Sequence, residues 1–368
     1  MAERDRFRHL LALRPENAAA KLADSPVCLL NSHHILQALK DRECIVMAAN
    51  TRIKHVIPGI MRAAKDTDAV VSFQLAKSES DLSGGYTGWV PESYFQSILE
   101  YADRVGYFLP FFIHGDHITI KNTSEAEINT ARELIVAQLD AGYTSFCVDA
   151  SFNPLADNIR ITAELAKPIK DASLGLEVEV GEIKSAGLEG GEITTVEEAV
   201  EFITGLEQRG IHPDLLAINN GSKHGNYLEG EEISIDLERT GEIYQAIKPR
   251  VVGIAQHGIT GTPLHIVGKF AEYGIRKGNV GTQWQNIAHK ELPPELMARM
   301  KGWAQENNKD VKMASKPFRA EIDGVDEDCK RRIEERSYQE AANFIKAFRS
   351  EGTASMVAEA LKGGGSSP

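Results

Sequence analysis

Two histidines and a carboxylate stand together in one short segment, His114-Gly115-Asp116-His117. The segment follows an apolar run over residues 107–113, which is the pattern of a buried parallel strand. On a parallel α/β scaffold, active sites are built at the carboxyl ends of strands. The segment could therefore supply a metal ligand and an acid/base group together. Taken alone, a structural histidine pair beside a helix cap is the slightly better interpretation.

Later strand ends carry the same residue types. Glu177 and Glu179 alternate with apolar residues in one predicted strand, so both carboxylates point to one face. Two carboxylates on one side of a buried strand are costly unless they are paired or bind a cation. The next two predicted strands run into His224 and His257. This combination predicts a site for zinc or a similar divalent metal with an open coordination position.

Both later histidines lie in glycine-rich turns, residues 221–225 and 257–261. Glycines let the backbone approach a ligand and present N–H groups to an anion. Late loops of such barrels often bind phosphate, and Ser222, Thr260 and Thr282 could add hydroxyl donors. Without the histidines, ordinary turn chemistry would be the better interpretation.

Eight short apolar runs, separated by stretches with helical spacing, must position these residues. The predicted strands are residues 43–49, 69–76, 108–113, 144–149, 174–180, 214–220, 251–256 and 274–280. Helical spacing is clearest over residues 124–141, 157–170 and 195–209. Alternating β and α units in this number predict an α/β fold of the (β/α)8 TIM-barrel type. A doubly wound open sheet is the alternative, because it also has buried parallel strands.

Three segments are expected along the chain. Residues 1–42 form an N-terminal helical extension, residues 43–290 the catalytic barrel, and residues 291–368 a C-terminal helical arm with a flexible glycine-rich tail. The arm is highly charged with helical spacing. It could pack on the barrel or on a neighbouring subunit, and a solvated helical face is an equally good interpretation.

Composition narrows the classes of partner and compartment. A net charge of −12 over 368 residues argues against general binding to nucleic acid or to an anionic membrane surface. An anionic substrate would need local attraction from backbone N–H groups, a metal ion or a few lysines. The sequence has neither a membrane-spanning apolar stretch nor the apolar core of a signal peptide. Four scattered cysteines without a C-x-x-C pair favour a reducing cytoplasm.

Taken together, five motifs resemble those of the class II, metal-dependent fructose-bisphosphate aldolase family. They are H-x-D-H at residues 114–117, E-x-E-x-G at 177–181, G-[ST]-x-H-G at 221–225, H-G-x-[ST]-G at 257–261 and K-x-N-[IV]-x-T at 277–282. The match extends from about Asn50 to Trp284, in the family's order. The resemblance implies a zinc (β/α)8 barrel that cleaves or forms ketose bisphosphates.

The resemblance also implies metal ligands. His117, His224 and His257 would bind the zinc ion, with Glu179 as an alternate or accessory ligand. Cobalt or manganese would suit the same ligands. A monovalent cation is a further candidate cofactor.

The acid/base groups follow from the same resemblance. Asp116 would work on the C4 hydroxyl of the sugar. A loop glutamate would move the proton at C3, and Glu189 is a better positional match than Glu182 or Glu192.

The remaining active-site residues would contact the substrate. Asn279 would bind the dihydroxyacetone part, and Asn50 and Asp149 fall where the family places active-site residues, although Asp149 could instead cap the following helix. The phosphate of the dihydroxyacetone part would be bound by Gly225, Gly258, Thr260, Gly261 and Thr282.

Two positions depart from the family motifs. Gly281 stands where K-x-N-[IV]-D-T has an aspartate, and Ala76 stands where Q-x-S has a serine. These departures indicate an outlying branch, in which strict specificity for fructose 1,6-bisphosphate does not follow from the family.

We therefore expect a metal-dependent aldolase that reversibly cleaves a ketose bisphosphate through a metal-stabilised enediolate. Fructose 1,6-bisphosphate, giving dihydroxyacetone phosphate and glyceraldehyde 3-phosphate, is the first candidate substrate. Tagatose bisphosphate or another ketose phosphate is the alternative. A metal-dependent sugar-phosphate hydrolase and a non-catalytic sugar-phosphate-binding protein are the alternative functions. A homo-oligomer, dimer or tetramer, is expected from the resemblance.

The basic residues are expected to lie outside the covalent chemistry. The expected mechanism needs no lysine that forms a Schiff base. We therefore expect phosphate contacts or surface charges at Lys121, Lys184, Lys223 and Lys277. We expect the arm residues Arg319, Arg331 and Arg332 to be solvated. The alternative is that they contact the distal phosphate of a substrate bound to a neighbouring subunit.

Overall fold

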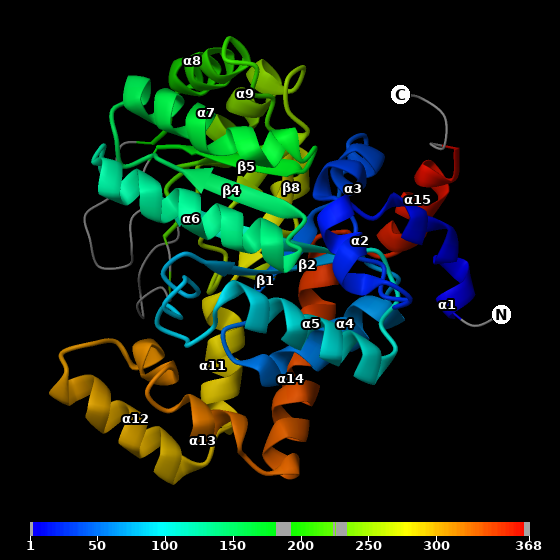
Figure 1. Ribbon diagram of the computed structural model, residues 1–368, viewed down its shortest axis with the longest axis vertical. Helices are drawn as coiled ribbons and strands as arrows, with labels where there is room; N and C mark the ends of the chain where they lie inside the picture. Colours follow the sequence, from blue (N-terminus) through cyan, green and yellow to red (C-terminus); the bar gives the residue numbers. More distant parts are fainter. Residues whose placement is uncertain (1–2, 182–192, 224, 226–233, 364–368) are drawn as a thin grey trace.

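Eight parallel strands close into a barrel that is surrounded by helices (Figure 1). The structure, a computed structural model, describes residues 3–181, 193–223, 225 and 234–363. Each strand pairs with the next, and β8 closes the ring on β1. The (β/α)8 barrel is therefore confirmed, and the open sheet is wrong. The strands are β1 (Val46–Asn50), β2 (Val71–Ala76), β3 (Phe112–Thr119), β4 (Ser145–Asp149), β5 (Gly175–Val180), β6 (Leu215–Ile218), β7 (Gly253–Gln256) and β8 (Ile275–Val280).

Helices precede, separate and follow the strands. Three come before β1: α1 (Glu3–Arg6), α2 (Glu16–Leu22) and α3 (Ser32–Leu39). Those between strands are α4 (Ile57–Asp66), α5 (Pro91–Val105), α6 (Glu125–Ala141), α7 (Leu155–Asp171), α8 (Val196–Glu207), α9 (Leu237–Ile247) and α10 (Leu264–Val267). After β8 come α11 (Thr282–Glu291), α12 (Pro294–Glu306), α13 (Arg319–Asp323), α14 (Glu327–Ala347) and α15 (Thr353–Ala360). Short 3-10 helices cover Arg8–Leu13, Lys54–Val56, Phe270–Tyr273, Val311–Ser315 and Leu361–Gly363.

Local sequence explains where the predicted helices begin. α8 begins after Thr195, whose hydroxyl accepts from the Glu198 N–H while the Glu198 carboxylate accepts from the Thr195 N–H. This capping box satisfies N–H groups that the first helical turn leaves without partners. α6 begins after Ser124, whose hydroxyl accepts from the Glu127 N–H, and ends at Gly142, which adopts φ of +103°. Glycine favours this left-handed conformation at a helix end.

The third strand differs most from its prediction. The apolar run was expected to form the strand and the polar H-x-D-H segment to follow it, but β3 begins at Phe112 and contains that whole segment. The residue before the strand, Phe111, pairs with the N-terminal extension, because it exchanges backbone hydrogen bonds with Cys28 and Leu30. The polar residues continue the strand because their side chains find partners inside the barrel.

The C-terminal helices pack directly on the barrel. α14 lies along α4 and contacts α11, and α15 contacts α3 (Figure 1). The crossing of α4 and α14 is close at Gly59, where a Cβ would lie 2.2 Å from the Glu334 carbonyl oxygen and 2.8 Å from the Tyr338 nitrogen. Within the described residues, no helix is long and apolar enough to span a bilayer.

Gly59→Ala is expected to destabilise the protein by about 1–3 kcal/mol, because both obstructing atoms belong to the backbone and the helices must separate. Urea unfolding measures the change. Gly302→Ala is the matched control, since Gly302 lies within α12 and a Cβ there meets no atom within 4 Å. That substitution should stabilise slightly through helix propensity. Equal stability of the Gly59 variant and the wild type would contradict this close helix contact.

Candidate active site

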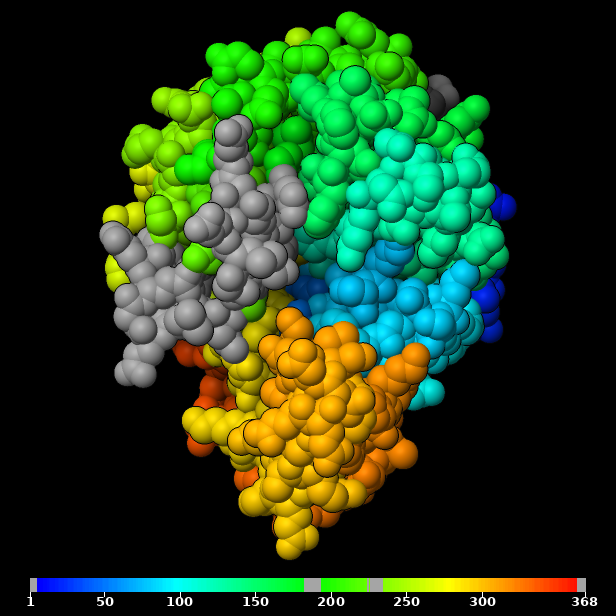
Figure 2. Space-filling view, turned by 90° about the vertical axis from the view of Figure 1, so that its left-hand side faces the viewer, coloured from blue at the N-terminus to red at the C-terminus, as the bar shows by residue number. Residues whose placement is uncertain are grey.

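A cavity of about 530 Å³ opens at the carboxyl end of the barrel strands. In Figure 2 the surface is hollowed near the centre of the view, where segments coloured blue to cyan, green and orange meet. The cavity walls come from the loops after several strands, with Lys312 added from the C-terminal region. The predicted residues Asn50, Asp116, His117 and Glu179 line it. The same cavity is lined by Asp149, Gly225, His257, Gly258, Thr260, Asn279 and Thr282.

A bulge in β3 allows two consecutive residues to face this cavity. In a regular strand Asp116 and His117 would point to opposite sides. The pairing of β3 with β4 shifts between Gly115 and Ile118, and His117 adopts a left-handed φ of +38°. Bulges re-aim side chains next to active sites, and strained backbone is concentrated at such sites. Gly115 points outward, where a Cβ would lie 2.2 Å from the Gln138 amide oxygen.

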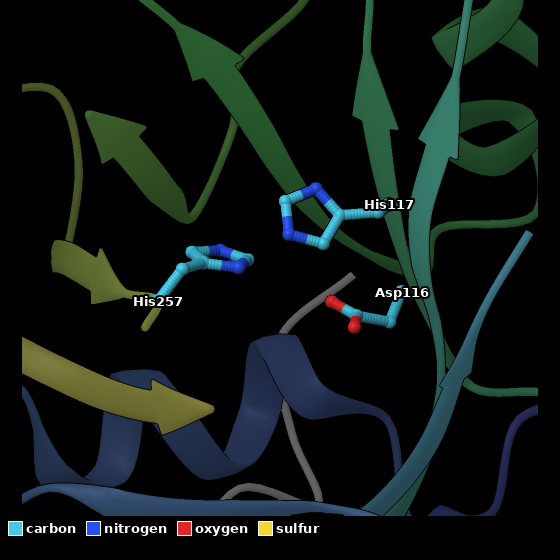
Figure 3. Close-up of side chains that lie close together, drawn as sticks. All are labelled: Asp116, His117 and His257. Atoms are coloured by element: carbon cyan, nitrogen blue, oxygen red, sulfur yellow. The ribbon is translucent and has the colours of Figure 1, made fainter. Parts of the chain in front are cut away.

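Three side chains converge in this space: Asp116, His117 and His257 (Figure 3). Their candidate ligand atoms all lie within 4.8 Å of one another, and the two imidazole rings are 4.1 Å apart between centroids. Imidazole nitrogens and a carboxylate oxygen at this spacing can share one divalent ion, and this donor set suits zinc. The residues therefore fit a metal, although the predicted third imidazole, His224, lies outside the described residues.

Interior hydrogen bonds orient His257. Its Nε2 lies 3.0 Å from Glu177 Oε1, so that nitrogen donates to the carboxylate. Its Nδ1 lies 3.1 Å from the amide nitrogen of Asn279 and is therefore the nitrogen with the lone pair. A carboxylate that accepts from one ring nitrogen fixes the other as the metal-binding atom.

Two carboxylates face His117 from the neighbouring strands. Its Nδ1 lies 3.1 Å from Glu179 Oε2 and 3.4 Å from Asp149 Oδ2. A metal bond would therefore be made by Nε2, the other ring nitrogen. Burial opposes protonation of this imidazole, but Glu179 and Asp116 outweigh it and hold the pKa of His117 well above its ordinary value.

Glu179, predicted as an alternate or accessory ligand, lies beside His117. It groups with His117 and Cys147, rather than with His257, as a possible ligand set. Burial, reinforced by the Asp149 carboxylate, raises the pKa of Glu179 to about 8. Through its contact with His117 Nδ1 it can orient that imidazole, and its place in the group with His117 and Cys147 also allows it to be a ligand itself.

Two amides position the Asp116 carboxylate. Oδ2 accepts from Asn50 at 2.8 Å, and Oδ1 accepts from Asn279 at 2.9 Å. Burial opposes ionisation, but His117 and Lys277 outweigh it and hold the pKa of Asp116 below its ordinary value. The group is therefore ionised and fixed beside the candidate metal ligands, where it could accept a proton from a substrate hydroxyl within hydrogen-bond reach.

An ion pair lies in the barrel interior below these residues. Lys277 Nζ lies 2.8 Å from Glu177 Oε2 and donates to Asn279 Oδ1 at 2.8 Å. The expected role of Lys277 as a phosphate contact or surface charge is therefore wrong, because its side chain is fully buried. His114 also supports this layer, with Nδ1 2.7 Å from the Ser145 hydroxyl.

The turns after β7 and β8 lie against each other. The Thr260 hydroxyl accepts from the Gln283 N–H at 3.1 Å, near the start of α11. Gly258, at φ of +67°, passes so close to Lys223 that a Cβ would lie 2.5 Å from the Lys223 carbonyl oxygen. Thr282 is the first residue of α11. The predicted phosphate residues of these two turns are therefore brought together.

Several predicted residues contribute differently or lie elsewhere. The Asp149 carboxylate accepts from the Ser151 N–H and hydroxyl, so it caps this turn and not α7, whose N-cap is Pro154. The candidate proton-moving glutamates Glu182, Glu189 and Glu192 lie outside the described residues, and so does Lys184.

The three arginines of the C-terminal arm have partners within the chain. Arg319 stacks on Trp89, while ion pairs join Arg331 to Asp328 and Arg332 to Glu291.

Among the cavity residues that the sequence analysis missed, Arg52 and Glu79 form an ion pair. Arg52 follows the end of β1 by two residues, so its position at a strand end was an available signal. Glu79 lies three residues after β2 in a loop, where the pattern of apolar residues gives no information.

Comparisons with known proteins agree with this geometry. The chain matches the family described as fructose-bisphosphate aldolase class-II over residues 30–351. It is 27% identical over 263 residues to the fructose-bisphosphate aldolase of Streptococcus pneumoniae serotype 4, covering 70% of this chain and 80% of that protein. It is 29% identical over 265 residues to the 6-phospho-5-dehydro-2-deoxy-D-gluconate aldolase of Halalkalibacterium halodurans, covering 70% and 81%.

Solved structures show the same fold. The YdjI aldolase of Escherichia coli K12 superposes with a TM-score of 0.64 at 19% identity, covering 89% of this chain and 99% of that one. A putative fructose-1,6-biphosphate aldolase of Coccidioides immitis gives a TM-score of 0.63 at 19% identity, covering 88% and 98%.

Proposed function

The chain belongs to the class-II fructose-bisphosphate aldolase family, and we propose that it is a metal-dependent aldolase that reversibly cleaves a ketose phosphate to dihydroxyacetone phosphate and an aldehyde. The observation that carries the proposal is the convergence of Asp116, His117 and His257 in one cavity at the carboxyl end of the barrel. This arrangement combines a metal-binding pair of imidazoles with an ionised carboxylate fixed beside them.

The proposed roles follow from the geometry. His117 and His257 hold the divalent ion, with His224 as the proposed third ligand. When bound, the ion polarises the substrate ketone and stabilises the negative charge that develops as the carbon–carbon bond breaks. Asp116 accepts the proton of the C4 hydroxyl as that carbon becomes the aldehyde, and returns it in condensation. Glu189 is the proposed group that delivers a proton to C3 of the other product.

The turns after β6, β7 and β8 are proposed to bind the phosphate next to the ketone. Gly225, Gly258, Gly261 and the first turn of α11 offer backbone N–H groups there, and Thr260 and Thr282 offer hydroxyls. Fructose 1,6-bisphosphate is the first candidate substrate, supported by the names of the relatives. Tagatose bisphosphate is the alternative. The relative named for 6-phospho-5-dehydro-2-deoxy-D-gluconate shows that substrates differ among the chain's relatives.

Metal removal is expected to abolish cleavage, because the proposed mechanism has no other group that can stabilise the charge on the ketone oxygen. Treatment with a chelator should remove activity, and added zinc, cobalt or manganese should restore it. Borohydride with substrate should leave activity intact, since no lysine forms a Schiff base. Covalent trapping of substrate on a lysine would contradict the metal-dependent mechanism.

One assay separates the aldolase from a hydrolase. Each candidate substrate is incubated with the metal-loaded protein, and triose phosphate and inorganic phosphate are measured separately. Triose phosphate is the expected product. Release of inorganic phosphate alone would indicate a hydrolase and contradict the proposal, as would neither product across fructose, tagatose and other ketose phosphates.

A further inference from the structure

Two positions depart from the family motifs, Ala76 and Gly281, and both lie against one buried ion pair, Arg52 with Glu79. Arg52 Nε donates to Glu79 Oε1 at 2.6 Å, and Nη2 lies 2.6 Å from the same oxygen. The Ala76 N–H donates to Glu79 Oε2 at 3.0 Å. A Cβ at Gly281 would lie 3.0 Å from Arg52 Nη2, so the missing side chain at that position makes room for the guanidinium.

This pair is buried in the wall of the cavity. The side chains of Arg52 and Glu79 are 11% and 4% exposed, and both line the cavity. Burying two charges costs free energy that their mutual attraction often fails to recover. Glu79 is also fixed by Asn50, which donates to its Oε2 at 3.0 Å and to Asp116. The pair is thus continuous with the candidate catalytic carboxylate.

The guanidinium reaches the proposed phosphate site. Arg52 Nη1 donates to the Thr282 hydroxyl at 3.3 Å and to the Gln285 amide oxygen at 3.0 Å. Both partners belong to the first turns of α11, the helix that follows β8. A helix N-terminus attracts anions, and the loops after strands 7 and 8 often bind phosphate in such barrels. Arg52 therefore brings a positive charge to the edge of this site.

The lysines near the cavity have partners or positions that differ from those of Arg52. Lys277 pairs with Glu177 in the barrel interior, and Lys77 Nζ lies 2.9 Å from Glu127 Oε1. Lys121 and Lys312 also line the cavity. Lys121 follows β3, on the opposite side of the ring from β7 and β8. Nε and Nη2 of Arg52 contact Glu79, so Nη1, which faces Thr282 and Gln285, is the nitrogen that a phosphate at the first turn of α11 would contact.

We propose that Arg52 binds the substrate phosphate on the ketone side, that Glu79 orients it, and that Gly281 leaves the space it needs. An aspartate at position 281, as in the family motif, would bring a second carboxylate to Arg52 in addition to Glu79, and its negative charge would repel the phosphate. The space left by Gly281 and the position of the Arg52 guanidinium are therefore linked in this structure. The proposal rests on the proposed function, since it assigns this phosphate to a ketose-phosphate substrate.

Binding of inorganic phosphate and of dihydroxyacetone phosphate tests the proposal without catalysis. Isothermal titration calorimetry on metal-free protein should show about 10- to 100-fold weaker binding of both ligands to Arg52→Gln, the loss expected for a hydrogen bond to a charged group. Gly281→Asp should reproduce most of this loss. Lys54→Gln is the control for removal of a charge near Arg52 in the chain. Lys54 pairs with Asp323 and does not line the cavity, so the substitution should change affinity less than about twofold. Wild-type affinity in Arg52→Gln, or no phosphate binding by the wild type, would overturn the proposal.

A second variant separates binding from folding, since Arg52→Gln leaves the Glu79 carboxylate buried without its cation. Arg52→Gln/Glu79→Gln removes both charges together and should fold while still binding phosphate weakly. Phosphate affinity at the wild-type level in this folded variant would show that the pair is structural only.

Failure of the proposed function gives a different result. If the wild type cleaves no ketose phosphate but binds phosphate through Arg52, the aldolase assignment fails and the anion site stands. If the wild type cleaves its substrate and Arg52→Gln keeps the wild-type KM and phosphate affinity, the role of Arg52 fails and the aldolase stands.

Discussion

Replacing Asp116 with asparagine is expected to lower kcat for ketose-phosphate cleavage by about 10²- to 10⁴-fold. The amide keeps the size of the carboxylate but cannot accept the C4 hydroxyl proton. It also disturbs the fixed geometry, because the carboxylate accepts from Asn50 and Asn279 on its two oxygens and an asparagine offers only one. Steady-state kinetics at saturating substrate, with metal content measured on the same sample, gives the result.

The metal measurement decides how the loss is interpreted. Retained metal with low kcat supports an acid/base role, whereas loss of metal would make Asp116 a ligand, which its place in the candidate ligand set permits. Asp81→Asn is the control. That carboxylate also lines the cavity but accepts from Ser83 and Gly85 within its own loop, so kcat should stay near the wild-type value. Near-normal kcat in Asp116→Asn at full metal occupancy would contradict the proposed role.

The barrel could be predicted from the sequence because the same pattern, an apolar strand followed by an amphipathic helix, is repeated along the chain. Each strand is a short apolar run, and each helix has its own periodicity, so an error at one boundary does not change the topology. The third strand shows the limit. His114 and Asp116 give a polar pattern that is typical of a loop, and only the buried partners Ser145 and Asn50 explain why they lie within β3.

The sequence predicted which strand ends carry the candidate site, but not how the side chains there are arranged. Residue types at those ends identified His117 and His257, and the spacing of Glu177 and Glu179 placed both carboxylates inside. The sequence could not show the bulge that turns His117 toward the cavity, because that depends on the pairing of β3 with β4. The contacts of Arg52 could not be predicted either, because its partners Glu79 and Thr282 lie 27 and 230 residues away in the chain.

Glu177→Gln is expected to have the largest effect on stability. Its carboxylate pairs with Lys277 and accepts from His257 in the barrel interior, where both side chains of the ion pair are 1% exposed. The amide leaves the lysine charge buried without a counter-ion, which costs about 3–5 kcal/mol of the free energy of unfolding. It also weakens the orientation of His257, so metal affinity should fall by about 10- to 100-fold. Urea unfolding of metal-free protein and competition with a chromophoric chelator measure the two effects.

Glu177→Gln/Lys277→Met separates the two consequences. Removing both charges should recover most of the lost stability, because no unpaired charge remains in the interior. Metal affinity should stay low, since the double variant still lacks the carboxylate that accepts from His257 Nε2. Recovery of metal affinity in the double variant would mean that the buried lysine charge, and not the orientation of His257, had weakened binding. Wild-type stability in the single variant would contradict a neutralising role for Glu177, because the lysine would then have to be uncharged or paired elsewhere.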